Sequence, residues 1–277
     1  MKKSIVFLLM IFMCFIAGCG EQEEAAFIFG THLCEYDMYI ESGNDIGINF
    51  PFAYNVSKDD IKLLGLEGDN IDISEISFFD DTIEPCNGVE INGYKLGFLG
   101  LRVDGCKKSF TINKLNIEIA GKEESLIFDI PLTIHICDNG NEIYERNTAD
   151  YIGSTGARKN SLMYSFFVNN NVIITGYDMT GPYIVEKADI SSGDIEISRL
   201  PYEMHKDEGL LFWVDTNTID EDGYKFLGFN FLVKYTNEEG EECTYYVPVR
   251  QQGAGDEESC YNLLKLMVEK YSDEETR

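Results

Sequence analysis

The chain of 277 residues carries 49 acidic residues against 22 lysines and arginines, a formal net charge of −27. Such an acidic surface repels phosphate backbones and anionic lipid headgroups, which argues against nucleic-acid binding and against membrane contact through basic residues. Because 44% of the residues are hydrophobic and the acidic residues are spread along the chain, a folded body is expected rather than disorder. The length suits two domains, with one large β domain as the alternative.

The first twenty residues are typical of an export signal. Lys2 and Lys3 form a short basic start, residues 5–16 form an apolar run, and small residues followed by Cys19 close it. A membrane-spanning helix needs about 20 apolar residues, so this shorter run is not expected to span a bilayer. The segment therefore predicts export.

The residues Ile-Ala-Gly-Cys at positions 16–19 resemble the lipobox of bacterial lipoproteins. The resemblance implies that signal peptidase II removes residues 1–18 and that Cys19 is lipidated, which anchors the protein on the extracytoplasmic face of a cell membrane. A plain secretory signal with an incidental cysteine is the alternative. Removal of the leader leaves 20 basic and 49 acidic residues, a formal net charge of −29. Residues 19–26 then form a short tether that reaches roughly 25 Å.

Residues 27–145 are predicted to form a first β-sandwich domain. Short runs rich in Ile, Phe, Tyr and Leu alternate with turn signals that contain Gly, Asn and Asp, and no amphipathic helix of ten or more residues separates them. This spacing is typical of an antiparallel sandwich rather than an α/β fold. Residues 56–68 are the one segment of this region that could form a short helix instead of a strand, because Ser57 is placed to cap a helical turn.

A second β series is predicted after a polar, glycine-bearing linker at residues 146–161. Residues 162–252 again show short apolar runs between turns, so a second antiparallel sandwich is expected. The strand count makes both domains immunoglobulin-like by analogy, and that analogy implies no function.

Residues 253–277 change to a helical period. The apolar residues of one predicted helix face are Leu263, Leu264, Met267, Val268 and Tyr271. Residues 256–259 are suited to cap the start of this helix. The helix is expected to dock on the second sheet.

Six cysteines remain after the leader and Cys19 are set aside, and an even number outside the cytosol favours disulfides. The candidates are Cys34, Cys86, Cys106, Cys137, Cys243 and Cys260. Pairing within domains favours a bridge from Cys243 to Cys260 and leaves three connectivities open for the other four. A zinc site is disfavoured because neither a C-x2-C pair nor a cluster of Cys and His at ligand spacing occurs. No cofactor is expected.

No catalytic frame surrounds the three histidines, His32, His135 and His205. Alternation in its strand makes His135 a surface or strand-pair residue rather than a catalytic base. Neighbouring carboxylates such as Asp80 and Asp81 are explained by solvated turns, although a hydrolase with paired carboxylates stays an alternative.

A weak calcium candidate lies in the acidic segment 215–223, which has some likeness to the start of an EF-hand loop. Its oxygen-bearing side chains are those of Asp215, Asn217, Asp220 and Asp222. Ile219 stands at a ligand position of that loop, so an ordinary acidic turn is favoured and no metal site is assigned.

Aromatic residues make up 13% of the chain, and most are expected in the core. Tyr202, Trp213, Tyr245 and Tyr246 are candidates for a surface on which sugar rings or a partner protein stack. Trp213 lies in an apolar run, so the core is favoured for this one.

Together these patterns predict a lipid-anchored envelope protein with a binding or structural role and no enzymatic activity. The expected partner is a protein or a glycan close to the membrane. The alternatives are a hydrolase that uses paired carboxylates and a solute-binding lipoprotein, and the latter is disfavoured because no βαβ alternation occurs.

Overall fold

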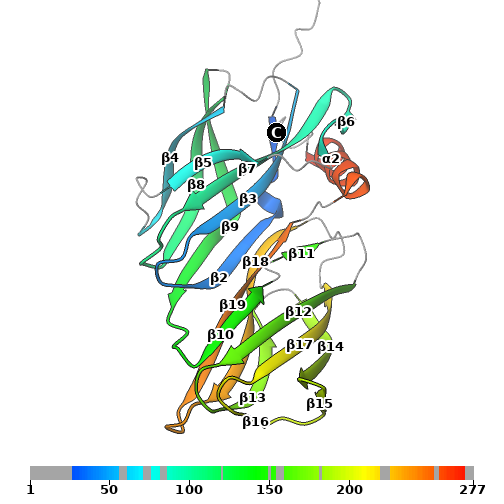
Figure 1. Ribbon diagram of the computed structural model, residues 1–277. Coiled ribbons are helices and arrows are strands. Elements are labelled where there is room, and N and C mark those ends of the chain that lie inside the picture. Colours follow the sequence, from blue (N-terminus) through cyan, green and yellow to red (C-terminus); the bar gives the residue numbers. More distant parts are fainter. Residues whose placement is uncertain are drawn as a thin grey trace, which may run out of the picture.

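The structure, a computed structural model, describes residues 27–55, 61–70, 76–81, 86–119, 121–148, 151–153, 159–180, 183–218, 225–252 and 256–271. These residues form nineteen strands, one short 3-10 helix and one α-helix. Two β-sandwiches lie end to end, and the helix lies beside the first of them (Figure 1). The predicted fold class, mostly β with sandwich domains and a C-terminal helix, is confirmed.

The first sandwich is built from the N-terminal half of the chain. A five-stranded sheet in the order β1-β3-β7-β5, with β6 paired to β7, faces strands β2, β9, β8 and β4. Its elements are β1 (Phe27–Phe29), η1 (Thr31–Leu33), β2 (Cys34–Glu41), β3 (Ile46–Tyr54), β4 (Ile61–Asp69), β5 (Ile76–Asp81), β6 (Glu90–Ile91), β7 (Tyr94–Val103), β8 (Phe110–Ile119) and β9 (Lys122–Cys137).

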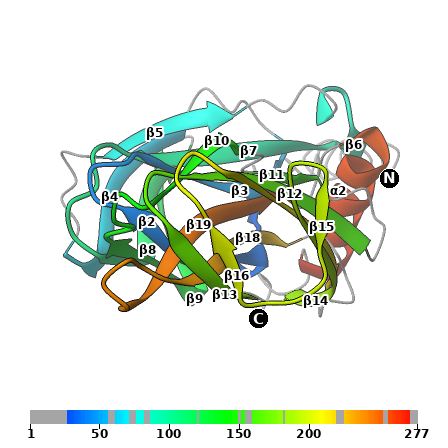
Figure 2. The same ribbon diagram turned by 60° about the horizontal axis from the view of Figure 1, so that its bottom comes forward.

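The second sandwich has a five-stranded sheet in the order β10-β12-β17-β14-β15, which faces strands β11, β19, β18, β13 and β16. Its elements are β10 (Ile143–Thr148), β11 (Tyr151–Gly153), β12 (Lys159–Val168), β13 (Val172–Met179), β14 (Tyr183–Ser192), β15 (Ile195–Ile197), β16 (Tyr202–Met204), β17 (Gly209–Thr218), β18 (Phe226–Thr236) and β19 (Glu242–Gln252). The end of this sandwich that carries β15 and β16 comes forward in Figure 2.

Each sandwich has its own hydrophobic core, and period-two alternation explains which side chains enter it. Strand β2 shows the rule clearly, because Cys34, Tyr36, Met38 and Ile40 are buried while the residues between them are not. In the second core, Phe212 and Phe231 lie edge to face with ring centroids 5.4 Å apart, an arrangement that aromatic pairs prefer.

One nine-stranded sheet runs through both sandwiches. Strand β18 of the second unit pairs with β2 of the first, and β2 pairs with β9 on its other side. Both pairings are parallel, as is that of β11 with β19. The prediction of antiparallel sheets is therefore wrong for these three strand pairs. A short hairpin can join only antiparallel strands, but strands that are far apart in the sequence can also pair in parallel.

The predicted linker also carries regular structure. Strand β10 pairs with β12, and the buried side chain of Ile143 belongs to the second core. Strand β11 pairs with β19, so residues 146–161 contain strands where a connection without secondary structure was expected. The helical competitor at residues 56–68 is wrong from Ile61 onward, since this part is β4, paired with β8; residues 56–60 lie outside the described residues.

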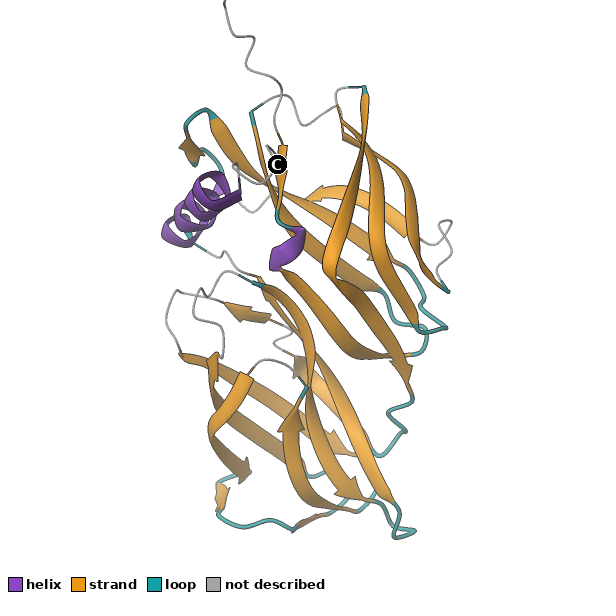
Figure 3. Ribbon diagram, turned by 180° about the vertical axis from the view of Figure 1, so that it is seen from behind, coloured by secondary structure: helices purple, strands orange, loops and turns teal. Residues whose placement is uncertain are grey.

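The C-terminal helix α2 (Glu257–Tyr271) is confirmed, but its predicted docking partner is wrong. Ser259 N–H donates to the Asp256 carboxylate at 2.7 Å, and the Asp256 N–H donates to Ser259 Oγ at 3.0 Å, which caps the first turn. Leu263, Leu264 and Met267 are fully buried in the core of the first sandwich. Figure 3 shows the helix beside that sandwich, so the chain returns to its N-terminal unit.

The junction of the two sandwiches rests on a close backbone approach. The parallel pairing of β18 with β2 covers Phe226–Gly228 and Cys34–Tyr36. A Cβ atom at Gly228 would lie 2.3 Å from Cδ1 of Tyr36, so only glycine permits this contact.

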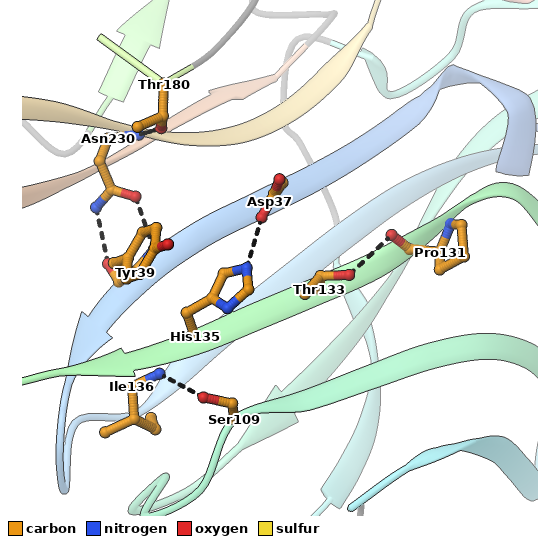
Figure 4. A network of polar contacts seen from close by, with 9 residues as sticks. All are labelled: Asp37, Tyr39, Ser109, Pro131, Thr133, His135, Ile136, Thr180 and Asn230. Carbon is orange, nitrogen blue, oxygen red and sulfur yellow. Dashed lines mark hydrogen bonds and ion pairs between the residues drawn. The ribbon is translucent and has the colours of Figure 1, made fainter. Parts of the chain in front are cut away.

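Beyond the paired residues of β2 and β18, the side chain of Asn230 connects the two strands in place of backbone–backbone hydrogen bonds (Figure 4). Its Oδ1 accepts a hydrogen bond from the Tyr39 N–H at 2.6 Å, and its Nδ2 donates to the Tyr39 carbonyl at 2.8 Å. The Asn230 N–H donates to Thr180 Oγ1 at 2.8 Å. This side chain is fully buried, so it joins the two units through satisfied polar groups.

Among the described residues, no helix is long and apolar enough to cross a bilayer.

Candidate binding face

The outer face of the sheet formed by β10, β12, β17 and β14 carries an unusual set of apolar side chains. Directly paired residues of antiparallel strands point to the same side, and Met163 pairs with Trp213 while Tyr144 pairs with Phe167. Leu211 lies between these two pairs on β17. We call these five residues the Trp213 face.

Three side chains of the Trp213 face are strongly exposed to solvent. Trp213 is 46% exposed, Met163 48% and Tyr144 39%. The ring of Tyr144 stacks on Phe167 with centroids 5.7 Å apart. A Cβ atom at Gly209, which pairs with Phe167, would lie 3.0 Å from that ring, so the absence of a side chain leaves room for it. The face is therefore open and partly aromatic.

Charged groups border the Trp213 face on β14. Asp189 is the cross-strand partner of Trp213, and the Lys187 ammonium donates to the Asp189 carboxylate at 2.5 Å. This hydrogen bond, followed by the charges of Asp189, Asp215 and Glu196, raises the pKa of Lys187. Among the side chains that the structure describes here, the carboxylates of Asp189, Asp215 and Glu196 outnumber the Lys187 ammonium.

The exposure of Trp213 corrects the prediction that it lies in the core. Its neighbours Phe212 and Val214 are fully buried, so alternation turns Trp213 to the outside. The apolar run Leu-Leu-Phe-Trp-Val hides this alternation, because residues on both faces of the strand are apolar.

The three tyrosines that were predicted with Trp213 do not form an open stacking surface. Tyr202 is half-buried and donates its hydroxyl to Glu208 at 2.9 Å. Tyr245 packs on the second core, where its ring and that of Phe166 lie nearly perpendicular with centroids 5.9 Å apart. Tyr246 stacks on Tyr39 with centroids 4.6 Å apart. All three side chains are therefore engaged in contacts within the protein.

His135 is a strand-pair residue, as predicted. It lies opposite Tyr39 across β9 and β2, stacks on that ring at 4.6 Å, and its Nε2 lies 2.8 Å from Asp37 Oδ1 (Figure 4). Nearby, the Ser109 Oγ accepts a hydrogen bond from the backbone N–H of Ile136, the residue after His135. The row of His135, Tyr39 and Tyr246 stabilises the junction.

The other two histidines lie far apart in the chain. His32 is half-buried in η1, and His205 is an exposed loop residue whose N–H donates to Glu208 at 2.9 Å.

The cysteines pair differently from the prediction. A disulfide joins Cys86 and Cys260 across 174 residues of sequence, so the predicted bridge between Cys243 and Cys260 is wrong. The reason is that α2 docks on the first sandwich, which carries Cys86. Cys34, Cys137 and Cys243 carry free thiols, the first buried and the other two half-buried, and Cys106 is buried. Burial, with a smaller contribution from Glu41, raises the pKa of Cys137 to about 11.

The calcium candidate lies mostly outside the described residues. Asp215 is half-buried on β17, Asn217 is described only in its backbone, and Asp220 and Asp222 are not described. Among the described residues, no cluster of three or more His, Cys, Asp or Glu side chains is arranged to hold a metal ion. Cys19 also lies outside the described residues.

No known protein family matches the sequence, and no curated protein is similar to it. The major pilin subunit BcpA of Bacillus cereus is 8% identical, with 59% of this chain and 59% of the pilin chain covered and a TM-score of 0.30. The chain thus spans about three fifths of the length of that pilin subunit.

Two further solved structures are similar in part. The Enterococcus faecalis MSCRAMM ACE is 7% identical, with 84% of this chain and 96% of the other covered and a TM-score of 0.26. The protein SGBP-B of a Bacteroides ovatus mixed-linkage glucan utilization locus, solved with a mixed-linkage heptasaccharide, is 12% identical, with 79% and 44% covered and a TM-score of 0.18. Similarity this low carries no argument about function.

Proposed function

We propose that this protein is a lipid-anchored, extracytoplasmic binding protein without enzymatic activity, and that the Trp213 face holds a glycan. The observation that carries the proposal is the exposure of Trp213, Met163 and Tyr144 on one face of the same sheet. Monomeric proteins rarely expose contiguous large apolar side chains unless that surface binds something. The open face suits an extended chain of sugars better than a small solute that needs enclosure.

The chemistry of the face supports a glycan. An indole or phenol ring offers a flat apolar surface to the C–H groups of a sugar ring. The bordering carboxylates of Asp189 and Asp215 accept hydrogen bonds from hydroxyl groups. With a formal net charge of −27 for the whole chain, polyanionic glycans are repelled, so the expected ligand is a neutral polysaccharide.

Replacing Trp213 with alanine should weaken glycan binding at least tenfold and leave the fold intact, because nearly half of this side chain is already exposed. The measurement is affinity electrophoresis of the secreted Cys19→Ser chain in gels that contain glucan, mannan or galactan, with polygalacturonate as the anionic comparison. Retardation is expected with a neutral polysaccharide only.

The matched control is Ile127→Ala, since Ile127 is 65% exposed on the first sandwich and should leave the retardation unchanged. Retardation by none of the neutral polysaccharides would contradict the glycan proposal, and crosslinking of the anchored protein on cells would then test a protein partner. Release of soluble sugars from the gel polysaccharide would instead favour the hydrolase alternative.

The anchor is tested separately, by labelling cells with a fatty acid analogue. Incorporation into the protein and its recovery with membranes should both be lost in the Cys19→Ser variant, because the thiol is the proposed acceptor of the lipid. Cys14→Ser is the matched control and should keep both properties, since Cys14 belongs to the removed leader. Membrane recovery of Cys19→Ser equal to that of the unaltered protein would refute the anchor.

A further inference from the structure

The Trp213 face has two contact points that lie apart along its strands. The first is formed by Trp213 and its cross-strand partner Met163. The second is formed by Tyr144, the cross-strand partner of Phe167. Because positions 163 and 167 lie on the same strand, β12, the two points are separated by roughly 14 Å at the usual rise of a strand. A single sugar ring is too small to reach both.

Both contact points face the same side of the sheet. Tyr164 and Phe166 are buried, so alternation turns Met163, Ser165 and Phe167 to the outside. The residues paired with these three across β10 and β17 point to the same side. One ligand on the outer face can therefore meet both points.

Both contact points present exposed side-chain surface. Trp213 and Met163 are each exposed by nearly half, and Tyr144 remains 39% exposed although its ring stacks on Phe167. When one ligand engages both points, the second contact forms within an existing complex. The overall affinity then exceeds that of either contact alone.

Short side chains lie between the two contact points. Ser165 is the cross-strand partner of Leu211, and Leu211 is in turn opposite Ser191. All three are half-buried, and a serine side chain is too short to form a barrier on the face. Its hydroxyl both donates and accepts hydrogen bonds, as the hydroxyl groups of sugars do. A sugar chain that crosses this part meets an apolar residue flanked by two hydroxyl groups.

The shape of the face selects among glycans. In a chain of sugar rings joined by 1,4-linkages that are equatorial at both ends, successive rings continue in one direction as an extended ribbon. Axial α-linkages turn the chain into a coil, and a coil that touches one contact point curves away from the other. An extended chain is also stiffer, so it loses less conformational entropy on binding.

We propose that the Trp213 face recognises an extended, β-1,4-linked chain of neutral sugars by contacting it at two points. This inference rests on the proposed glycan function and specifies the class of glycan. One sugar stacks on Trp213 beside Met163, a sugar further along contacts Tyr144, and the sugars between them lie over Leu211 and the two serines. Chain length therefore decides the affinity, because a disaccharide engages one contact point only.

The test uses the fluorescence of Trp213, the one tryptophan of the chain, which reports directly on the first contact point. The Cys19→Ser chain is titrated with cello-oligosaccharides and with manno-oligosaccharides, from disaccharide to hexasaccharide. At least one of these β-1,4-linked series should change the emission, and its hexasaccharide should bind at least tenfold more tightly than its disaccharide. The α-1,4-linked malto-oligosaccharides should show no such increase with length.

Tyr144→Ala should remove the dependence on length. The hexasaccharide should then bind about as weakly as the disaccharide, and disaccharide binding should stay unchanged because the first contact point is intact, which also shows that the variant is folded. Tyr144→Phe keeps the ring and should retain the tight binding. The matched control is Tyr261→Ala, since Tyr261 is an exposed ring on α2 and should leave both affinities unchanged.

The inference is overturned if the emission does not respond, if the hexasaccharide binds no more tightly than the disaccharide, if Tyr144→Ala keeps the dependence on length, or if malto-oligosaccharides bind equally well or better. In each of these cases, retardation by a neutral polysaccharide in the gels would leave the glycan function standing. Absence of both the emission change and the retardation would reject the two proposals together.

Discussion

Replacing Cys86 with serine is expected to lower the free energy of unfolding by about 3–5 kcal/mol. Cys86 and Cys260 are 174 positions apart in the sequence, so their disulfide closes a long loop. Closing such a loop strongly reduces the conformational entropy of the unfolded chain. It also holds α2, which places Leu263, Leu264 and Met267 in the first core. The measurement is urea unfolding of the oxidised protein, with a fully reduced sample for comparison.

Cys243→Ser is the matched control for this experiment. Cys243 is half-buried, its thiol donates a long contact to the Glu241 carbonyl at 3.7 Å, and it is hydrogen-bonded to Tyr235. A serine hydroxyl can form both hydrogen bonds, so this substitution should change the free energy of unfolding by less than about 1 kcal/mol. The two variants also discriminate the possible bridges to Cys260. A large loss with Cys243→Ser and a small one with Cys86→Ser would refute the pairing of Cys86 with Cys260.

Replacing Asn230 with leucine is expected to cost about 2–4 kcal/mol and to loosen the junction of the two sandwiches. Leucine is similar in size, but it leaves the N–H and the carbonyl of Tyr39 without the partners that now lie at 2.6 and 2.8 Å. An unpaired, partly buried polar group costs about 1–3 kcal/mol. Urea unfolding measures the loss, and hydrogen exchange at the Tyr39 amide measures the loosening.

Asn113→Leu is the control for the Asn230 experiment, because Asn113 is exposed on β8. This substitution should change the free energy of unfolding of the protein by less than about 0.5 kcal/mol. Unchanged exchange at the Tyr39 amide in Asn230→Leu, together with unchanged stability, would contradict the role of Asn230 as the link between the units.

Local patterns were sufficient for most of the strands and for the C-terminal helix. Alternation in β2 and the turn signals between strands depend on neighbours in sequence, and so does the cap of α2 by Asp256 and Ser259. The same patterns misled at residues 61–69, where acidic residues and leucines suited a short helix but the segment forms β4 beside β8. Pairing with a neighbouring strand overrides a weak local preference.

The sequence predicted the type of site, an aromatic surface, but not which residues form it. Aromatic stacking was expected, and Trp213 was among the candidates, but it was assigned to the core while the three tyrosines were left as surface candidates. In a run where every residue is apolar, hydrophobicity does not reveal which side faces out. Only the pairing of Trp213 with Met163 and Asp189 shows that it lies on the outer face.

The sequence by itself determined the mostly β class, the C-terminal helix and the acidic character, because these follow from composition and from contacts within a few residues. The tertiary structure alone decided the bridge of Cys86 to Cys260, the docking of α2 on the first sandwich and the parallel pairing of β2 with β18. Each of these joins residues far apart in the chain. Burial and backbone hydrogen bonding select such contacts from many that the residue pattern allows equally.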